Sequence, residues 1–364
     1  MNQDNIFSGI VGNPPYTVAV GSGNSVSIYP LFFELSYELG EKSSIISPAR
    51  WMTSQNASSK RGRYGIIEGE RELNFRKMFY VEDSSTIFKT VEVKGGISWW
   101  LHDRGYHGET EFVVNGETKG ERPLFNSHEL VDLDVEYSRL LDRLVSYSEK
   151  IAVVNSCDGI RNEFLRRGYK SSTATMLEHS TTTPTSPDDC KLRIPRHGWR
   201  FLPKGFLTPG RSVVPDGKYA MVFTHTSSNS PGSLNDRSFF LSGGEAAKST
   251  MAVILDTPQQ VYNLYKYSRT KFFRRLVESR LTSHDTYLQA YQDIPAFNFD
   301  ESDPIDWSLS IPEIDNALER HFKLEEVHDY IQGAVGPFAN VPEEEYLEKW
   351  EALGVDVSGV AEWY

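Results

Sequence analysis

The chain has 364 residues, of which 39% are hydrophobic and 24% are charged, and its formal net charge at pH 7 is −12. This length and mixture exclude a disordered or fibrous protein and suffice for two or three globular domains. A run of about 18 apolar residues is missing, which argues against a membrane-spanning helix. The N-terminus has no secretion signal, and Cys157 and Cys190 are far apart in sequence, so we expect a cytoplasmic protein without disulfides.

The first part of the chain alternates apolar strands with helical segments. The expected elements are strands over residues 6–12, 43–47 and near 78–81, a helix over 29–39 and a hairpin over 86–101. The first strand must end at Asn13, because two prolines follow it and proline cannot continue a strand. Gly40 is a typical end of the helix. Strands that alternate with helices predict a mostly parallel α/β sheet.

The remainder of the chain predicts loops and longer helices. The expected elements are helices over residues 129–149, 257–280, 314–332 and 343–353, with mobile polar loops over 171–187 and 225–236. The start of the second of these helices has three local signals. Thr257 is a capping residue, Pro258 takes the first helical position, and Gln260 completes a capping box.

Charge is distributed unevenly along the chain. Between Cys190 and Arg280, fifteen Lys and Arg residues oppose five Asp and Glu residues, a balance of +10. In residues 281–364, three oppose nineteen, a balance of −16. Single runs of charge are usually solvated faces, but a contrast of this size also fits a phosphate-binding middle, and both interpretations stay open. The candidate DNA-binding side chains are Arg193, Arg196, Arg200, Lys204, Lys271 and Arg274.

The motif Asn13-Pro14-Pro15-Tyr16 directly follows the first expected strand. The amino group of adenine is a poor nucleophile, because its lone pair is delocalised into the ring. An asparagine oxygen and a stiffly held backbone carbonyl beside it can accept both amine hydrogens and localise that pair. An aromatic ring in the fourth position can stack on the base, worth roughly 1–3 kcal/mol, which helps offset the cost of extracting the base from a duplex.

This motif resembles the signature of amino-methyltransferases, above all the adenine-specific (N6) DNA methyltransferases of bacterial restriction–modification systems. Later segments that are similar to the same family cover residues 29–33, 44–51, 93–101, 269–274 and 315–331. The resemblance implies that Asn13, Pro14, Pro15 and Tyr16 hold a flipped adenine. It also implies that an aromatic residue near Trp99 closes the pocket, although core packing explains Trp99 equally well.

The same resemblance implies the fold class and the domain boundaries. The fold is expected to be α/β, with a partial methyltransferase (Rossmann-like) sheet, a mixed α/β target-recognition domain and an acidic helical tail. The expected parts are the second half of the catalytic domain over residues 1–125, a connecting helix over 126–150, the target-recognition domain over 151–290 and the acidic helical region over 291–364.

The methyl donor of this family is S-adenosyl-L-methionine, and the chain lacks the motif that binds it. The family pattern requires an aromatic-x-Gly-x-Gly loop after a first strand and an acidic residue at the end of the second. Residues 21–23 are a Gly-Ser-Gly loop, but they follow the target motif and open no strand-to-helix turn. We therefore expect a second polypeptide or a second copy to complete the sheet. No metal site is expected, because the nine histidines do not cluster.

Three functions remain after this interpretation. The first is site-specific adenine-N6 methylation of double-stranded DNA, with a partner that binds the cofactor. The second is a non-catalytic DNA-binding or specificity module, or a remnant of such a methylase. The third is methylation of RNA or of a protein glutamine, against which the basic middle favours duplex DNA.

Overall fold

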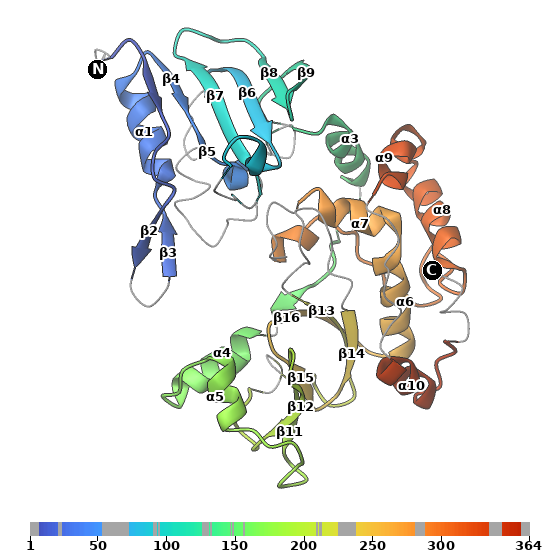
Figure 1. Cartoon of the computed structure of the whole chain (residues 1–364). Helices are drawn as coiled ribbons and strands as arrows, with labels where there is room; N and C mark the ends of the chain where they lie inside the picture. The colour runs from blue at the N-terminus through green and yellow to red at the C-terminus, as the bar shows by residue number, and fades with distance from the viewer. Residues whose placement is uncertain are drawn as a thin grey trace. The chain divides into compact units, whose positions relative to one another are not determined.

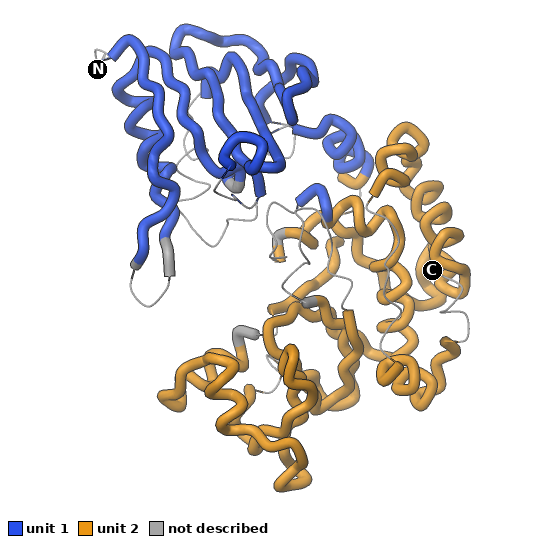
Figure 2. The backbone as a smooth tube through the Cα atoms, in the orientation of Figure 1, with its two compact units in different colours: residues 1–143, 229–232, 278–284 blue, residues 144–228, 233–277, 285–364 orange. Residues whose placement is uncertain are grey.

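The structure is a computed structural model of the chain. It describes residues 7–20, 24–52, 73–89, 93, 95–125, 131, 133–145, 147, 149–155, 157–208, 210, 213–224, 238–280, 288–334 and 344–357. The chain divides into two compact units (Figure 2). Unit 1 comprises residues 1–143, 229–232 and 278–284, and unit 2 comprises 144–228, 233–277 and 285–364. The expected loops over 21–23 and 225–236 lie outside the described residues.

In its described part, unit 1 is built on a seven-stranded sheet with the order β1-β4-β7-β6-β8-β9, and β5 also pairs with β7. The strands are β1 (Ile10–Gly12), β4 (Lys42–Ile45), β5 (Ser47–Pro48), β6 (Phe75–Val81), β7 (Ile97–Asp103), β8 (Thr110–Val114) and β9 (Glu117–Arg122). The pairs β1–β4 and β6–β8 are parallel, whereas β7 runs antiparallel to β4, β5 and β6. The expectation of a mostly parallel sheet is therefore wrong, and the sheet is mixed.

The hairpin expected over residues 86–101 is also wrong. Strand β7 pairs with β6, so that Trp100 lies opposite Met78. The preceding residues include the short 3-10 helix η3 (Ser84–Thr86), whose start is capped by the side chain of Asp83. The chain enters β7 through Gly95 and Gly96, both with positive φ. A side chain at Gly96 would lie 2.5 Å from the carbonyl oxygen of Val81, so this close turn requires glycine.

Helix α1 (Tyr29–Leu39) has the expected bounds and covers one face of the sheet (Figure 1). It ends at Gly40, where a Cβ atom would lie 2.9 Å from the carbonyl oxygen of Ser36. Phe33 packs edge-on against Trp100, with ring centroids 5.1 Å apart, and Trp100 stacks on Phe75 at 5.2 Å. These rings form the centre of the unit 1 core. The remaining elements of the unit are the hairpin β2 (Thr17–Val20) and β3 (Asn24–Ser27), helix α3 (Val135–Leu144) and the 3-10 helix η1 (Ala49–Met52).

Unit 2 contains two smaller sheets in its described part. The first has the order β10 (Val154–Asn155), β16 (Thr250–Leu255), β13 (Tyr219–Thr224) and β14 (Ser238–Ser242). The second has the order β12 (Gly198–Leu202), β11 (Cys190–Ile194) and β15 (Glu245–Ala247). Helices α4 (Cys157–Arg166) and α5 (Thr173–Glu178) share a core with this second sheet. Helix α5 replaces part of the loop expected over 171–187, because Ser172 caps it by accepting the backbone N–H of Thr175.

The other helices of unit 2 follow the second sheet. They are α6 (Pro258–Arg269), α7 (Lys271–Glu278), η4 (Leu288–Tyr291), α8 (Ile311–Phe322), η5 (Glu325–Val327), α9 (His328–Gln332) and α10 (Glu344–Ala352). The capping box of Thr257 and Gln260 is confirmed. The single helix expected over 257–280 is wrong, because Thr270 has an extended backbone and separates α6 from α7. Among the described residues, none of the helices is long and apolar enough to cross a membrane.

Candidate functional site

The turn formed by Asn13, Pro14, Pro15 and Tyr16 leaves the sheet at the carboxyl end of β1. The carbonyl oxygen of Gly12 accepts a hydrogen bond from the N–H of Ile46 at 3.0 Å, which anchors the chain directly before Asn13. The carbonyl oxygen of Tyr16 accepts the N–H of Ile28, also at 3.0 Å. The two prolines fix φ between these anchors. The backbone of the turn is therefore held at both ends.

Asn13 is exposed, and its side chain makes no hydrogen bond to another described residue. Its amide oxygen is thus available to accept a hydrogen bond from a ligand. This geometry is compatible with the amine-holding role predicted for Asn13, which stays a prediction.

Tyr16 is partly buried, and it packs against the core of unit 1. Its hydroxyl is buried without a hydrogen-bond partner among the described residues, and burial raises its pKa. An unpaired buried hydroxyl costs roughly 1–3 kcal/mol, which a polar atom of a ligand would reduce. The predicted stacking of this ring on a base requires that one face of the ring remain accessible.

A groove of about 550 Å³ lies beside Asn13 and Pro14, between β1 and α1. Its lining is mainly apolar and includes Ile10, Phe32 and Leu35. Val11 on β1 is 85% exposed, and in the described part of the sheet β1 pairs with β4 on one side and has no strand on the other. The motif therefore stands at an open, apolar sheet edge.

Trp99 lies away from this groove. It stacks on Phe79, with ring centroids 4.9 Å apart and planes at 7°, and both rings line another hollow of about 960 Å³. The neighbouring Trp100 points to the opposite face of the sheet, as successive strand residues do, and is completely buried. The structure therefore does not bring Trp99 and Asn13 into one pocket, and the predicted pocket-closing role of Trp99 finds no support here.

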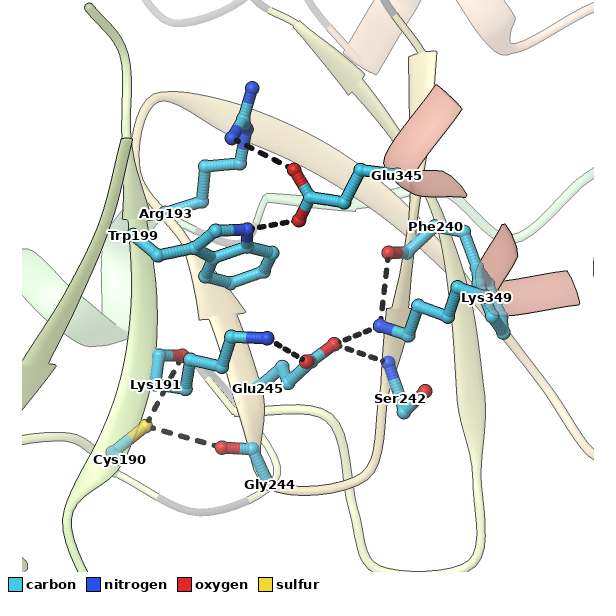
Figure 3. A network of polar contacts seen from close by, with 10 residues as sticks. All are labelled: Cys190, Lys191, Arg193, Trp199, Phe240, Ser242, Gly244, Glu245, Glu345 and Lys349. Atoms are coloured by element: carbon cyan, nitrogen blue, oxygen red, sulfur yellow. Dashed lines mark hydrogen bonds and ion pairs between the residues drawn. The ribbon is translucent and has the colours of Figure 1, made fainter. Parts of the chain in front are cut away.

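Two of the candidate DNA-binding arginines are already engaged within unit 2. Arg193 lies 3.9 Å from the carboxylate of Glu345 on α10, and its guanidinium is 5.8 Å from the ring of Trp199 (Figure 3). Arg200 donates hydrogen bonds to the hydroxyl and the carbonyl oxygen of Ser180, both at 3.2 Å. These contacts hold the side chains of Arg193 and Arg200 against other residues of unit 2. That either arginine contacts DNA stays a prediction.

Arg196 and Lys204 are the accessible members of the same candidate set. Arg196 is exposed and has a φ of 65°. The side chain of Lys204 is 74% exposed and lies 3.2 Å from Asp188. Both lie at the end of β11 or β12, where a phosphate would reach them without rearrangement of the core.

A side chain that contacts phosphate must be accessible, and the two candidates on α7 are not free for such a contact. Arg274 is 3% exposed, and Lys271 donates a hydrogen bond to the carbonyl oxygen of Gln332. On α6, Lys266 likewise donates to the carbonyl oxygen of Leu309 at 3.0 Å. Residues on both faces of α6 and α7 are buried, and the basic side chains of these helices donate hydrogen bonds to backbone carbonyl oxygens of the acidic tail. The structure therefore shows a packed rather than a solvated helix region, and the burial of Arg274 argues against its predicted phosphate contact.

The structure also reveals a buried acid that no sequence pattern indicates. Glu245 on β15 lies 3.0 Å from Lys191, accepts the N–H of Ser242 at 2.9 Å and pairs with Lys349 of α10 (Figure 3). Burial alone would raise the pKa of Glu245, but these hydrogen bonds outweigh it and lower the pKa. The ion pair between Glu245 and Lys349 connects α10 to the sheet. Because its two residues are distant in sequence, only the tertiary structure reveals it.

Comparison with known proteins bears on the N-terminal part most directly. Residues 1–88, which include β1 and the motif at Asn13, match the profile of the Eco57I restriction-modification methylase family. A stretch of 120 residues, 32% of this chain, is 29% identical to an uncharacterized adenine-specific methylase of Mycoplasma pneumoniae. The predicted resemblance to adenine-specific methylases of restriction–modification systems is confirmed for this part of the chain. The matched stretch covers 28% of that curated relative.

Solved structures of restriction–modification enzymes are similar to a larger part of the chain. The similarity to the Type IIL enzyme MmeI in complex with DNA covers 95% of this chain and 57% of the MmeI chain, at 11% identity and a TM-score of 0.42. The similarity to the type IIG restriction endonuclease BpuSI covers 98% of this chain and 52% of the BpuSI chain, at 11% identity and a TM-score of 0.29. The chain thus spans about half of these enzymes.

Proposed function

We propose that this chain is the target-amine and target-recognition part of a site-specific DNA adenine-N6 methyltransferase of a restriction–modification system. The observation that carries the proposal is Asn13, which stands exposed and without a described partner at the carboxyl end of β1, in the segment that matches the methylase family. Residues 1–125 then belong to the catalytic domain, 126–150 connect, 151–290 recognise the target, and 291–364 form the acidic helical region.

The turn holds the substrate by hydrogen bonds. The amide oxygen of Asn13 and an adjacent backbone carbonyl accept the two hydrogens of the adenine amine, which concentrates the lone pair on nitrogen. The anchors at Gly12 and Tyr16 keep these acceptors in position. The amine loses a proton only after it has received the methyl group, so no strong base is required beside Asn13.

The methyl donor implied by the family is S-adenosyl-L-methionine, and the described residues do not fit it completely. The groove beside Asn13 is lined by apolar side chains, with Asn13 and Ser36 as its polar members. It offers no carboxylate to bind the two hydroxyls of a ribose. The cofactor therefore needs residues beyond those that line this groove.

The open edge of β1 supports the partner that we propose for this purpose: a second polypeptide or a second copy. In a doubly wound sheet, ligands bind at the carboxyl ends of the strands where the strand order reverses. A strand added parallel to β1 would put Asn13 at such a position. It would also cover Val11 and Phe7, which are 85% and 51% exposed on an edge that has neither charge nor proline within β1.

The decisive experiment measures S-adenosylmethionine binding by calorimetry and methyl transfer to an adenine-containing duplex, with this chain alone and with a cofactor-binding polypeptide of the same family. We expect N6-methyladenine, identified by mass spectrometry, from the combination. Methylated RNA or glutamine in its place would reassign the substrate. Duplex binding without transfer in any combination would leave the non-catalytic specificity module as the function.

A further inference from the structure

A basic turn with an exposed aromatic ring ends helix α4. It consists of Arg166, Arg167, Gly168, Tyr169 and Lys170, and we call it the α4 turn. The side chain of Arg166 is 68% exposed, Tyr169 is 37% exposed, and Arg167 and Lys170 are also exposed. Gly168 has a φ of 79°, and the N–H of Tyr169 donates to the carbonyl oxygen of Phe164 at 2.8 Å. This left-handed ending turns the chain sharply and projects four large side chains from it.

Packed rings hold the α4 turn in place. The ring of Tyr169 lies 4.1 Å from that of His179 and 6.0 Å from that of Phe206, centroid to centroid. The guanidinium of Arg167 lies 4.4 Å from the centre of the Phe206 ring and donates a hydrogen bond to the carbonyl oxygen of Gly205. The turn is thus braced by the end of α5 and by the residues that follow β12. Figure 1 shows α4 and α5 side by side.

The surroundings of the α4 turn are predominantly basic. Arg161 is exposed on α4, and Lys204, next to Gly205, is 74% exposed. The nearby acid Glu163 is 6% exposed and is occupied by Arg166 at 2.6 Å and by the hydroxyl of Thr208 at 3.1 Å. Asp188 pairs with Lys204. Glu178 at the end of α5, next to His179, is a further exposed acid, and the Lys and Arg residues named here still outnumber the acids around the turn.

We propose that the α4 turn is a contact surface for duplex DNA, where Arg166 and Lys170 neutralise phosphates and Tyr169 packs against a sugar or base. Lys and Arg side chains bind phosphate oxygens and position a duplex, and exposed aromatic rings stack on bases. Solvation alone accounts for the exposed cations. It does not account for an exposed tyrosine ring that lies among them and is held in place by other rings. The inference rests on the proposed function, because it names the surface of the target-recognition region that meets the substrate.

The test is a salt titration of duplex binding by the full chain, followed by fluorescence anisotropy. The variant R166A/K170A removes two cations and leaves Arg167, whose guanidinium packs on Phe206. Its matched control is K218A/R320A, which removes two exposed cations elsewhere in unit 2. The variant Y169A probes the ring, and the thermal midpoint of each variant checks that it is folded.

We expect R166A/K170A to reduce the slope of log affinity against log salt by about 1.8, because each phosphate that is no longer neutralised removes about 0.9, while the control keeps the original slope. Y169A should weaken binding by roughly 5- to 150-fold, as removal of one stacked ring does, with an unchanged slope. Equal slopes for R166A/K170A and its control, with a folded variant, overturn the inference but leave the proposed function intact. Salt-independent binding, or no binding, by the wild-type chain overturns both.

Discussion

The carboxylate of Asp315 on α8 accepts the backbone N–H of Phe272 at 3.0 Å, so the acidic tail caps the first turn of a basic helix. A second oxygen of the same carboxylate accepts the N–H of Lys271 at 2.7 Å. The N-terminal end of a helix presents unpaired N–H groups and a partial positive charge, which an acid satisfies. The contrast between a basic middle and an acidic tail is therefore partly an internal packing relationship and does not reflect DNA binding alone.

Replacement of Asp315 by alanine should lower the free energy of unfolding by about 2 kcal/mol, because two N–H groups of α7 would then have no acceptor. Urea denaturation measures this change. The matched control is Glu301→Ala, which removes one exposed acid from the same tail and should change stability by less than about 0.5 kcal/mol. Equal destabilisation by the two substitutions would contradict the capping role.

Replacement of Asn13 by alanine should lower kcat/KM of the reconstituted enzyme by about 100- to 1000-fold, the usual effect of removing one hydrogen-bonding group that acts on the transition state. The duplex Kd should stay within about twofold and the thermal midpoint unchanged, since Asn13 is exposed. Asn316→Ala, on the exposed face of α8, is the control. If binding and turnover fell together, Asn13 would be structural.

Replacement of Val11 by lysine should prevent another strand from pairing with β1, because a charge on an edge strand opposes strand addition. The side chain is 85% exposed, so the isolated chain should remain folded. Sedimentation with and without a cofactor-binding polypeptide measures the association. Val145→Lys is a matched control at a residue that is 67% exposed elsewhere. A wild-type chain that stays monomeric at high concentration, with or without the polypeptide, would argue against the proposed partner.

The stability of unit 1 should fall as the pH decreases from about 6.5 towards 4. Burial lowers the pKa of His102 to about 4, with a smaller contribution from Arg104, while the pKa in the unfolded chain stays near the ordinary value of 6.5. The unfolded state therefore takes up the proton first, and acid favours unfolding in this interval. Replacement of His102 by glutamine should remove this part of the pH dependence, measured as the thermal midpoint from pH 7 to 4. A pH dependence identical to that of the wild type would show that other groups cause it.

Part of the fold was predictable because its signals are local. The bounds of α1 depend on Gly40, and the start of α6 depends on Thr257 and Gln260, a few residues apart in the chain. The target motif was recognisable for the same reason, since Asn13 and two prolines at a strand end form a continuous segment. Local hydrogen bonds and fixed φ angles determine such features without help from the rest of the chain.

Other features depend on residues that are distant in sequence. The pairing of β7 with β6 rather than with a neighbouring segment, and the break at Thr270, were not predictable from periodicity. The sequence around Arg274 is typical of a surface cation, but packing of both faces of α7 buries this side chain.

The sequence by itself determined the methylase resemblance and the place of Asn13 at the end of a strand, because a short motif is sufficient for both. Only the tertiary structure decided which cations are accessible. Burial of a side chain depends on which residues pack over it. Arg193 contacts helix α10, and Lys271 contacts the acidic tail. Both contacts join residues that are more than 50 positions apart in the chain, so the local sequence does not indicate them.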